Sequence, residues 1–218
     1  MISPSKLKAF ALCGTFLVAS AAHANLLTNG SFELGAFVNQ GNDTMSLAAG
    51  STVITGWTVV TDTTAWIGAT NPFGLSASDG SFFLDLTNYQ AGAPFAGMAQ
   101  TIATVVGATY SLSFDLGGSN LWGRPDSLTA SAAGTSQTFV TPTTGTNNDW
   151  YHETMQFVAT STSTTILLQG ASGNNYIGLD NASVEFISAP GVPEPGTWAL
   201  ALAGLVAVAF AKRRGERD

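Results

Sequence analysis

Residues 111–116 read Ser-Leu-Ser-Phe-Asp-Leu, a segment in which polar and apolar side chains alternate with a period of two. Successive side chains of a β-strand point to opposite faces, so this alternation predicts a strand with one face in a core. The same alternation recurs, in part, at residues 154–158, 164–168 and 177–186. Aromatic and β-branched residues thus fall in periodic runs, which favours a folded domain over disorder.

Further expected strands are rich in β-branched, aromatic or small apolar residues and lie at 57–61, 81–86, 98–103, 127–132 and 137–140. Turn sequences such as Thr28-Asn29-Gly30 and Ser78-Asp79-Gly80 separate the expected strands. No window of ten or more residues in this part of the chain has the 3.6-residue period of a surface helix. The pattern predicts an all-β domain, an antiparallel β-sandwich or jelly roll. The longest breaks, at 37–51, 117–126 and 141–149, are expected loops, where binding residues commonly lie.

The first 24 residues have the three parts of a secretory signal peptide. Lys6 and Lys8 form a basic region, residues 9–22 are mostly apolar, and Ala22-His23-Ala24 is an A-x-A cleavage site. A membrane-spanning helix is the alternative, but the apolar segment is shorter than the roughly 20 residues that span a bilayer. We expect cleavage between Ala24 and Asn25, which leaves a single domain at residues 25–190.

The other end of the chain joins a Pro-Glu-Pro segment, an apolar run and a basic cluster. Val192-Pro193-Glu194-Pro195 ends the domain, because proline lacks the N–H that a strand or helix interior needs. Residues 198–211 carry no charge and are expected to form one hydrophobic helix. Lys212, Arg213 and Arg214 mark a cytoplasmic side, followed by a tail at 215–218. The apolar run is short for a bilayer, so a marginal anchor and a signal that is cut both remain open.

Residues 191–214 resemble the PEP-CTERM sorting signal of Gram-negative bacteria. The resemblance implies export through the Sec machinery, transient anchoring in the inner membrane, and processing by an exosortase before arrival at the cell surface or extracellular matrix. That family is associated with biofilm and exopolysaccharide production.

A second resemblance covers nearly all of the expected domain. It rests on a series of short motifs in fixed order, at residues 25–33, 56–57, 80–86, 99–102, 107–114 and 178–184. The series is similar to that of the choice-of-anchor C family, and it implies a galactose-binding-like jelly roll of two facing antiparallel sheets. The resemblance also implies an absence of enzymatic activity and an association with polysaccharide. This chain departs from the pattern at Asn120-Leu-Trp-Gly-Arg-Pro125.

Charge and cysteine content exclude several classes of protein. Residues 25–191 contain eleven acidic residues and one basic residue, Arg124, for a net charge near −10. Such a surface repels phosphates, so nucleic-acid binding is excluded, whereas calcium, neutral polysaccharide or simple solubility suits it. Cys13 is the only cysteine and lies in the signal peptide, so the domain has no disulfide or thiol chemistry.

The residues for catalysis are scarce, and we expect no enzyme. His152 is the one histidine left after signal removal, which excludes zinc sites built on histidine pairs. No Gly-x-Ser-x-Gly elbow, Walker loop or Gly-x-Gly-x-x-Gly fingerprint occurs. A carboxylate pair for glycoside hydrolysis stays open, since eleven acidic residues remain.

Trp122 is the first candidate for sugar binding, because it lies in a Gly/Pro/Asn loop beside Arg124 and Asp126. Aromatic rings with a few polar groups are the usual lining of a binding pocket. The alternative is a tryptophan folded back over a sheet edge with Arg124 stacked on it. Tyr89 is a second candidate, whereas Trp57, Trp66 and Trp150 are expected in the core.

Glu33 and Asp180 are candidates for a structural calcium site, because the first and last strands of such jelly rolls lie side by side. The alternative is that both carboxylates accept hydrogen bonds from backbone N–H groups where the sheet closes. The sequence thus predicts an exported, non-catalytic module that binds exopolysaccharide. A structural matrix protein without a glycan ligand and a glycan-processing enzyme are the alternatives.

Overall fold

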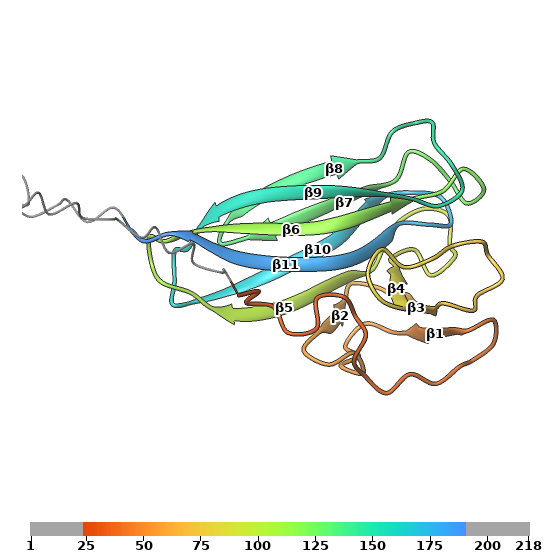
Figure 1. Ribbon diagram of the computed structural model, residues 1–218, viewed down its shortest axis with the longest axis horizontal. Helices are drawn as coiled ribbons and strands as arrows, with labels where there is room; N and C mark the ends of the chain where they lie inside the picture. Colours follow the sequence, from red (N-terminus) through yellow and green to blue (C-terminus); the bar gives the residue numbers. More distant parts are fainter. Residues whose placement is uncertain (1–23, 191–218) are drawn as a thin grey trace, which may run out of the picture.

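The computed structural model describes residues 24–190 (Figure 1). Most of the predicted signal peptide, the sorting segment at 191–214 with its apolar helix at 198–211, and the tail at 215–218 lie outside the described residues. Residues 24–190 form eleven strands and no helix. None of these residues belongs to a helix long and apolar enough to cross a membrane.

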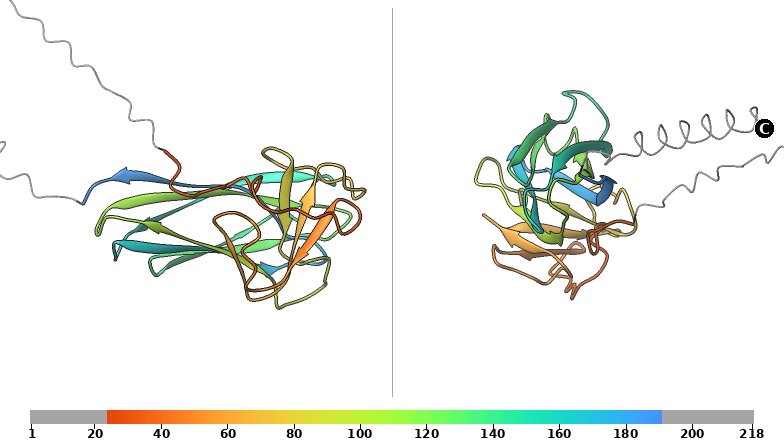
Figure 2. Two further views of the ribbon diagram at one scale, coloured as in Figure 1. Left: turned by 90° about the horizontal axis from the view of Figure 1, so that it is seen from below. Right: turned by 90° about the vertical axis from the view of Figure 1, so that its left-hand side faces the viewer.

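The strands form two antiparallel sheets that face each other, which confirms the predicted all-β sandwich. One sheet has six strands in the order β1 (Thr44–Leu47), β3 (Thr64–Gly68), β4 (Phe82–Asp85), β11 (Gly178–Ser188), β6 (Thr109–Gly118) and β9 (Asp149–Val158). The other has five, in the order β2 (Thr58–Val60), β5 (Gly97–Ala103), β10 (Ser163–Ser172), β7 (Ser127–Ala132) and β8 (Thr135–Val140). Figure 2 shows the two layers from further sides.

The alternating segment at 111–116 lies in β6, a central strand of the larger sheet. Leu112, Phe114 and Leu116 are fully buried. On one side β6 pairs with β9 over its whole length, and on the other it pairs with β11. The alternation in its sequence therefore arises because one face of β6 packs against the opposite sheet.

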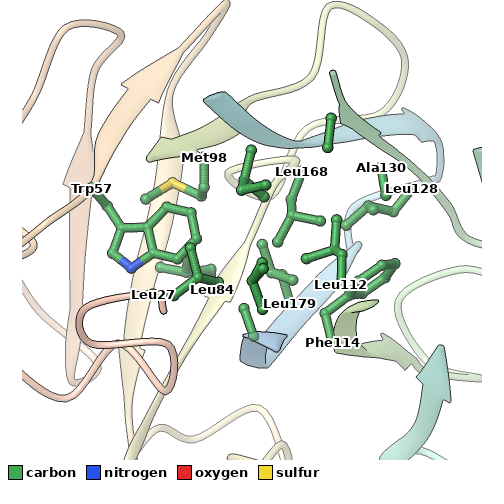
Figure 3. Packing of buried hydrophobic residues seen from close by; sticks show 14 of the residues in the cluster. Leu27, Trp57, Leu84, Met98, Leu112, Phe114, Leu128, Ala130, Leu168 and Leu179 are labelled. Atoms are coloured by element: carbon green, nitrogen blue, oxygen red, sulfur yellow. The ribbon is translucent and has the colours of Figure 1, made fainter. Parts of the chain in front are cut away.

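The core fills the space between the two sheets (Figure 3). Leu84, Leu112 and Leu179 of the larger sheet meet Leu128 and Leu168 of the smaller one. Trp57 and Trp66 are buried in this cluster, as predicted, whereas Trp150 is partly buried against a second, smaller cluster. Residues 24–190 thus contain both sheets and both hydrophobic clusters.

Two strands were missed and several were predicted too short. Strand β10, expected at 164–168, spans Ser163–Ser172, and β6, expected at 111–116, spans Thr109–Gly118. Strand β1 lies inside residues 37–51, which were wrongly expected to be a loop, and pairs with β3. Strand β3 is buried at all five positions, so it shows no polar–apolar alternation. Strand β9 begins at Asp149 rather than at residue 154, because its pairing with β6 continues to Gly118.

The molecule has two different ends (Figure 1). Strands β1 to β4 gather at one end with the loops at 119–126 and 141–148, at the right of the figure. Strand β11 starts at this end and runs to the other, where the described chain stops at residue 190. At about 3.3 Å per residue, its eleven residues separate the two ends by roughly 33 Å.

Candidate functional site

A cavity of about 500 Å³ opens at the end where β1 to β4 gather. Its apolar lining is rich in aromatic rings and comprises Ile67, Phe73, Leu75, Tyr89, Trp122 and Tyr176. Its polar lining comprises Asn42, Thr44, Asp85 and Asn175. The structure thus brings together Trp122 and Tyr89, the two aromatic residues that the sequence singled out.

Phe73 joins these two residues into one aromatic wall. Its ring centroid lies 5.7 Å from that of Tyr89 and 5.9 Å from that of Trp122, the latter pair being T-shaped. The Trp122 indole N–H donates to the Phe73 carbonyl oxygen at 3.2 Å. Trp122 is therefore a half-buried part of the wall and not a free-standing platform, whereas 40% of Tyr89 is exposed.

Arg124 lies apart from the residues that line the cavity. Its side chain is 3% exposed, forms an ion pair of 2.6 Å with Asp149, and donates at 3.2 Å to the Tyr151 hydroxyl. The guanidinium carbon lies 5.7 Å from the centroid of the Tyr151 ring, so Arg124 stacks there and not on Trp122. It also donates to the carbonyl oxygens of Pro142 and Thr146. Arg124 thus fastens the Trp122 loop to the loop at 141–148.

Asp126 is fully buried and does not line the cavity either. Neither carboxylate oxygen receives a hydrogen bond of normal geometry from the described residues. Burial raises its pKa to about 8, although the Arg124 charge and the Ser119 backbone N–H act in the opposite direction. The Tyr176 hydroxyl is also buried without a partner among the described residues, and burial raises its pKa.

Asp85 is a cavity residue that the sequence did not single out for ligand binding, although it is one of the eleven acidic residues left open for a carboxylate pair. It is buried, lines the cavity, and accepts hydrogen bonds from the backbone N–H groups of Thr87 at 2.9 Å, Tyr89 at 3.0 Å and Ile177 at 3.0 Å. Asn88 and Tyr89 both have left-handed backbones, with φ of 48° and 65°, and these bonds stabilise that turn. Burial raises the Asp85 pKa to about 6, against these same hydrogen bonds. Asp85 therefore positions Tyr89.

Glu33 and Asp180 hold one loop between them. Glu33 Oε1 accepts from the backbone N–H groups of Ser81 at 2.8 Å and Phe82 at 2.7 Å. Asp180 Oδ2 accepts from those of Ser78 at 2.7 Å and Asp79 at 2.9 Å, and burial raises its pKa to about 7.

These contacts are those of the second interpretation, in which both carboxylates accept backbone hydrogen bonds. No cluster of three or more acidic, histidine or cysteine side chains that could hold a metal occurs within residues 24–190. The N–H groups compete with a cation for the oxygens that they occupy, and calcium at this position stays a prediction.

Ser78, Asp115 and His152 form a polar cluster on the larger sheet. His152 Nδ1 lies 2.7 Å from Asp115 Oδ1, and the Ser78 hydroxyl donates to Asp115 Oδ2. The carboxylate thus stands between the serine and the histidine. In a hydrolase triad the histidine stands in the middle and takes the serine proton, so this cluster has a different order.

Comparisons with known protein families find a match for the C-terminal segment and another for the domain. The PEP-CTERM protein-sorting motif matches residues 191–214, as predicted, and it indicates an exported protein. No curated protein matches the chain.

Three solved carbohydrate-binding modules share only a general likeness with the domain. The structure of TmCBM61 in complex with β-1,4-galactotriose is 18% identical, with a TM-score of 0.45 over 75% of this chain and 99% of that one. A CBM4 structure is 18% identical, with a TM-score of 0.43 over 74% and 99% of the two chains. The family 16 carbohydrate-binding module-2 is also 18% identical, with a TM-score of 0.40 over 73% and 99%. At these scores the likeness assigns no ligand to this chain.

The family match concerns the domain itself and covers most of the chain. The model described as protein of unknown function (DUF642) matches residues 25–178, which include nearly all of the motif series noted in the sequence. The chain therefore belongs to the DUF642 family.

Proposed function

We propose that this chain is an exported, non-catalytic carbohydrate-binding protein whose cavity takes a sugar residue of an extracellular polysaccharide. The observation that carries the proposal is the cavity itself, in which Phe73, Tyr89 and Trp122 form an aromatic wall beside polar groups. Aromatic faces suit the C–H faces of a sugar ring, and a few placed polar groups suit its hydroxyls. The volume of about 500 Å³ lies within the usual range for small-ligand sites.

The position of the cavity fits a protein that is held by its C-terminal end. The sorting segment follows residue 190, at the end of the molecule that lies roughly 33 Å from the cavity along β11. While the chain is anchored, this arrangement presents the cavity away from the membrane. We propose that an exosortase processes the tail in a Gram-negative envelope and that the ligand is an exopolysaccharide of a biofilm matrix.

The net charge near −10 of residues 25–191 narrows the class of glycan. A polysaccharide rich in carboxylates or sulfates would be repelled by such a surface, because like charges that approach each other raise the free energy of binding. A neutral polysaccharide is the better match.

Affinity electrophoresis of residues 25–190 through gels that contain neutral or acidic bacterial polysaccharides tests the proposal. Retardation by a neutral polysaccharide is expected, with an affinity that falls about tenfold or more in Trp122→Ala, because a buried aromatic contact commonly contributes more than 1 kcal/mol. Leu121→Ala is the matched control, since Leu121 is 70% exposed in the same loop and does not line the cavity.

Each outcome of this assay is informative. Retardation that Trp122→Ala leaves unchanged would keep the function and discard the cavity as its site. No retardation in any gel would favour a structural matrix protein without a glycan ligand. Turnover of a polysaccharide, abolished by carboxylate-to-amide variants, would instead show a glycan-processing enzyme.

A further inference from the structure

The two sheets end in four edge strands within the described residues, and these edges differ in their protection. Strands β1 and β2 have four and three residues. Strand β9 has ten residues but contains Asp149, His152 and Glu153. Strand β8, Thr-Ser-Gln-Thr-Phe-Val, has six residues without a charge or a proline, and its register with β7 contains no bulge. Short edges, charges, prolines and bulges are the features that prevent strands from pairing with other molecules. Strand β8 therefore has no charge, proline or bulge, and with six residues it is longer than β1 and β2.

The turn before β8 determines which of its backbone groups face away from β7. Ala133 and Gly134 connect the two strands with φ of 50° and 83°, which is a two-residue turn with both φ values positive. In such a hairpin the flanking pair, Ala132 and Thr135, exchanges both backbone hydrogen bonds, and pairs then alternate along the ladder. The backbone N–H and C=O groups of Ser136, Thr138 and Val140 therefore point outward from the sheet.

Side-chain contacts agree with this assignment. The hydroxyls of Ser131 and Ser136 lie 2.9 Å apart, and those of Thr129 and Thr138 lie 2.8 Å apart. Residues in a non-hydrogen-bonded pair approach each other more closely than those in a hydrogen-bonded pair, so contacts of this kind are expected there.

We propose that β8 is a self-association edge, at which a second copy of this chain pairs with it in antiparallel orientation about a two-fold axis at Thr138. Thr138 then faces Thr138 of the second copy, and Ser136 faces Val140. Three pairs that each exchange two bonds give about six backbone hydrogen bonds. The smaller sheets of the two copies become one continuous sheet.

A second copy is the occupant because an identical strand, turned about a two-fold axis at Thr138, places the outward backbone groups of Ser136, Thr138 and Val140 opposite the same three residues. The charge distribution permits this pairing. Two domains with a net charge near −10 repel each other unless they meet through a surface without charge. The solvent-facing side chains of β7 and β8 provide such a surface, since they are Thr129, Ser131, Ser136, Thr138 and Val140. The two acidic residues that flank this hairpin do not oppose pairing, because Asp126 is fully buried and Asp149 is paired with Arg124.

Sedimentation velocity of residues 25–190, a segment that contains both sheets and the whole described core, tests the proposal at concentrations up to about 500 µM. We expect the mass to rise from monomer to dimer with concentration. Thr138→Lys should raise the dissociation constant at least about tenfold, because it places two ammonium groups opposite each other at the axis. Thr165→Lys is the matched control, since Thr165 is an exposed threonine on the same sheet in the central strand β10.

A single-cysteine variant gives a second measurement that does not depend on affinity. Residues 25–190 contain no cysteine. Hydrogen-bonded antiparallel partners have Cα atoms about 5.5 Å apart, a separation that a disulfide can bridge, so Thr138→Cys should form a covalent dimer under mild oxidation. Thr165→Cys should not.

The proposal is wrong if the domain stays monomeric at every concentration. It is also wrong if Thr138→Lys and Thr165→Lys weaken association equally, which would indicate pairing through the sheet face. A Thr138→Cys variant that cross-links no faster than Thr165→Cys would exclude the two-fold axis at Thr138. Circular dichroism of each variant confirms that the fold is intact before these results are compared.

Discussion

The domain is expected to lose stability as the pH rises. Replacement of Asp126 by asparagine should remove most of this loss. Asp126 is fully buried without a hydrogen bond of normal geometry, and burial raises its pKa from 3.8 to about 8. A group whose pKa is raised in the folded state contributes fully below its unfolded pKa, and this contribution is lost as the pH rises through the folded pKa.

The shift sets the magnitude of the effect. A difference of about four pH units at 1.36 kcal/mol per unit corresponds to at most about 6 kcal/mol, lost between roughly pH 4 and pH 8. Asparagine has the shape of the protonated carboxyl group and does not titrate. The variant should therefore match the wild type near pH 4 and exceed its free energy of unfolding by several kcal/mol near pH 9.

Urea unfolding of residues 25–190 at several pH values, followed by tryptophan fluorescence, measures this difference. Glu185→Gln is the control, because Glu185 is exposed and its replacement should shift stability equally little at each pH. Asp180 also has a raised pKa, but it is present in both proteins and its contribution cancels in the comparison. Asp85 does not cancel, because its charge is one of the causes that raise the Asp126 pKa, so the measured difference includes the repulsion between these two carboxylates. A difference between Asp126→Asn and wild type that does not change with pH would refute the reasoning.

Three further predictions concern the site, the carboxylates and the core. Asp85→Ala should reduce polysaccharide affinity about as much as Tyr89→Ala in the gel assay, because it removes the acceptor of the Tyr89 N–H. Unchanged affinity would show that the turn at Tyr89 does not contribute to binding. If calcium binds at Glu33 and Asp180, the melting temperature should be higher with calcium than with a chelator, and Glu33→Gln should abolish this difference. Equal melting temperatures with calcium and with chelator would contradict a calcium site at this position. Phe114→Ala should lower the free energy of unfolding by about 3–5 kcal/mol in urea, and a loss below 1 kcal/mol would contradict its place in the core.

The fold was largely predictable because most strands bury one face. The segment at 111–116 shows this, since its alternation corresponds to the burial of Leu112, Phe114 and Leu116 in β6. Strand β3 was not predictable in the same way, because burial on both faces removes the alternation. Strand β1, within residues 37–51, is four residues long and carries one fully buried side chain, Leu47, so it gives little periodic signal.

The site was predictable only in part, because it depends on contacts between distant segments. Trp122 and Tyr89 could be found from their loops, but Phe73 joins them from about 50 residues before Trp122, and nothing local indicates this. Adjacency in sequence was misleading for Arg124. Its side chain turns away from Trp122 because Asp149 and Tyr151, both in β9, offer it an anion and a ring face.

The direction of the proposed pairing constrains where two copies can meet. Antiparallel pairing of β8 reverses one domain relative to the other, so the cavity of one copy lies toward the C-terminal end of its partner. The two sorting segments then leave from opposite ends of the joint sheet, since each follows the end of β11 that lies roughly 33 Å from its cavity. Two copies anchored upright in the same membrane cannot adopt this arrangement, whereas copies released from their tails can. Together with the proposed function, the pairing proposal therefore links association to processing of the tail, and it places one proposed glycan cavity at each end of the dimer.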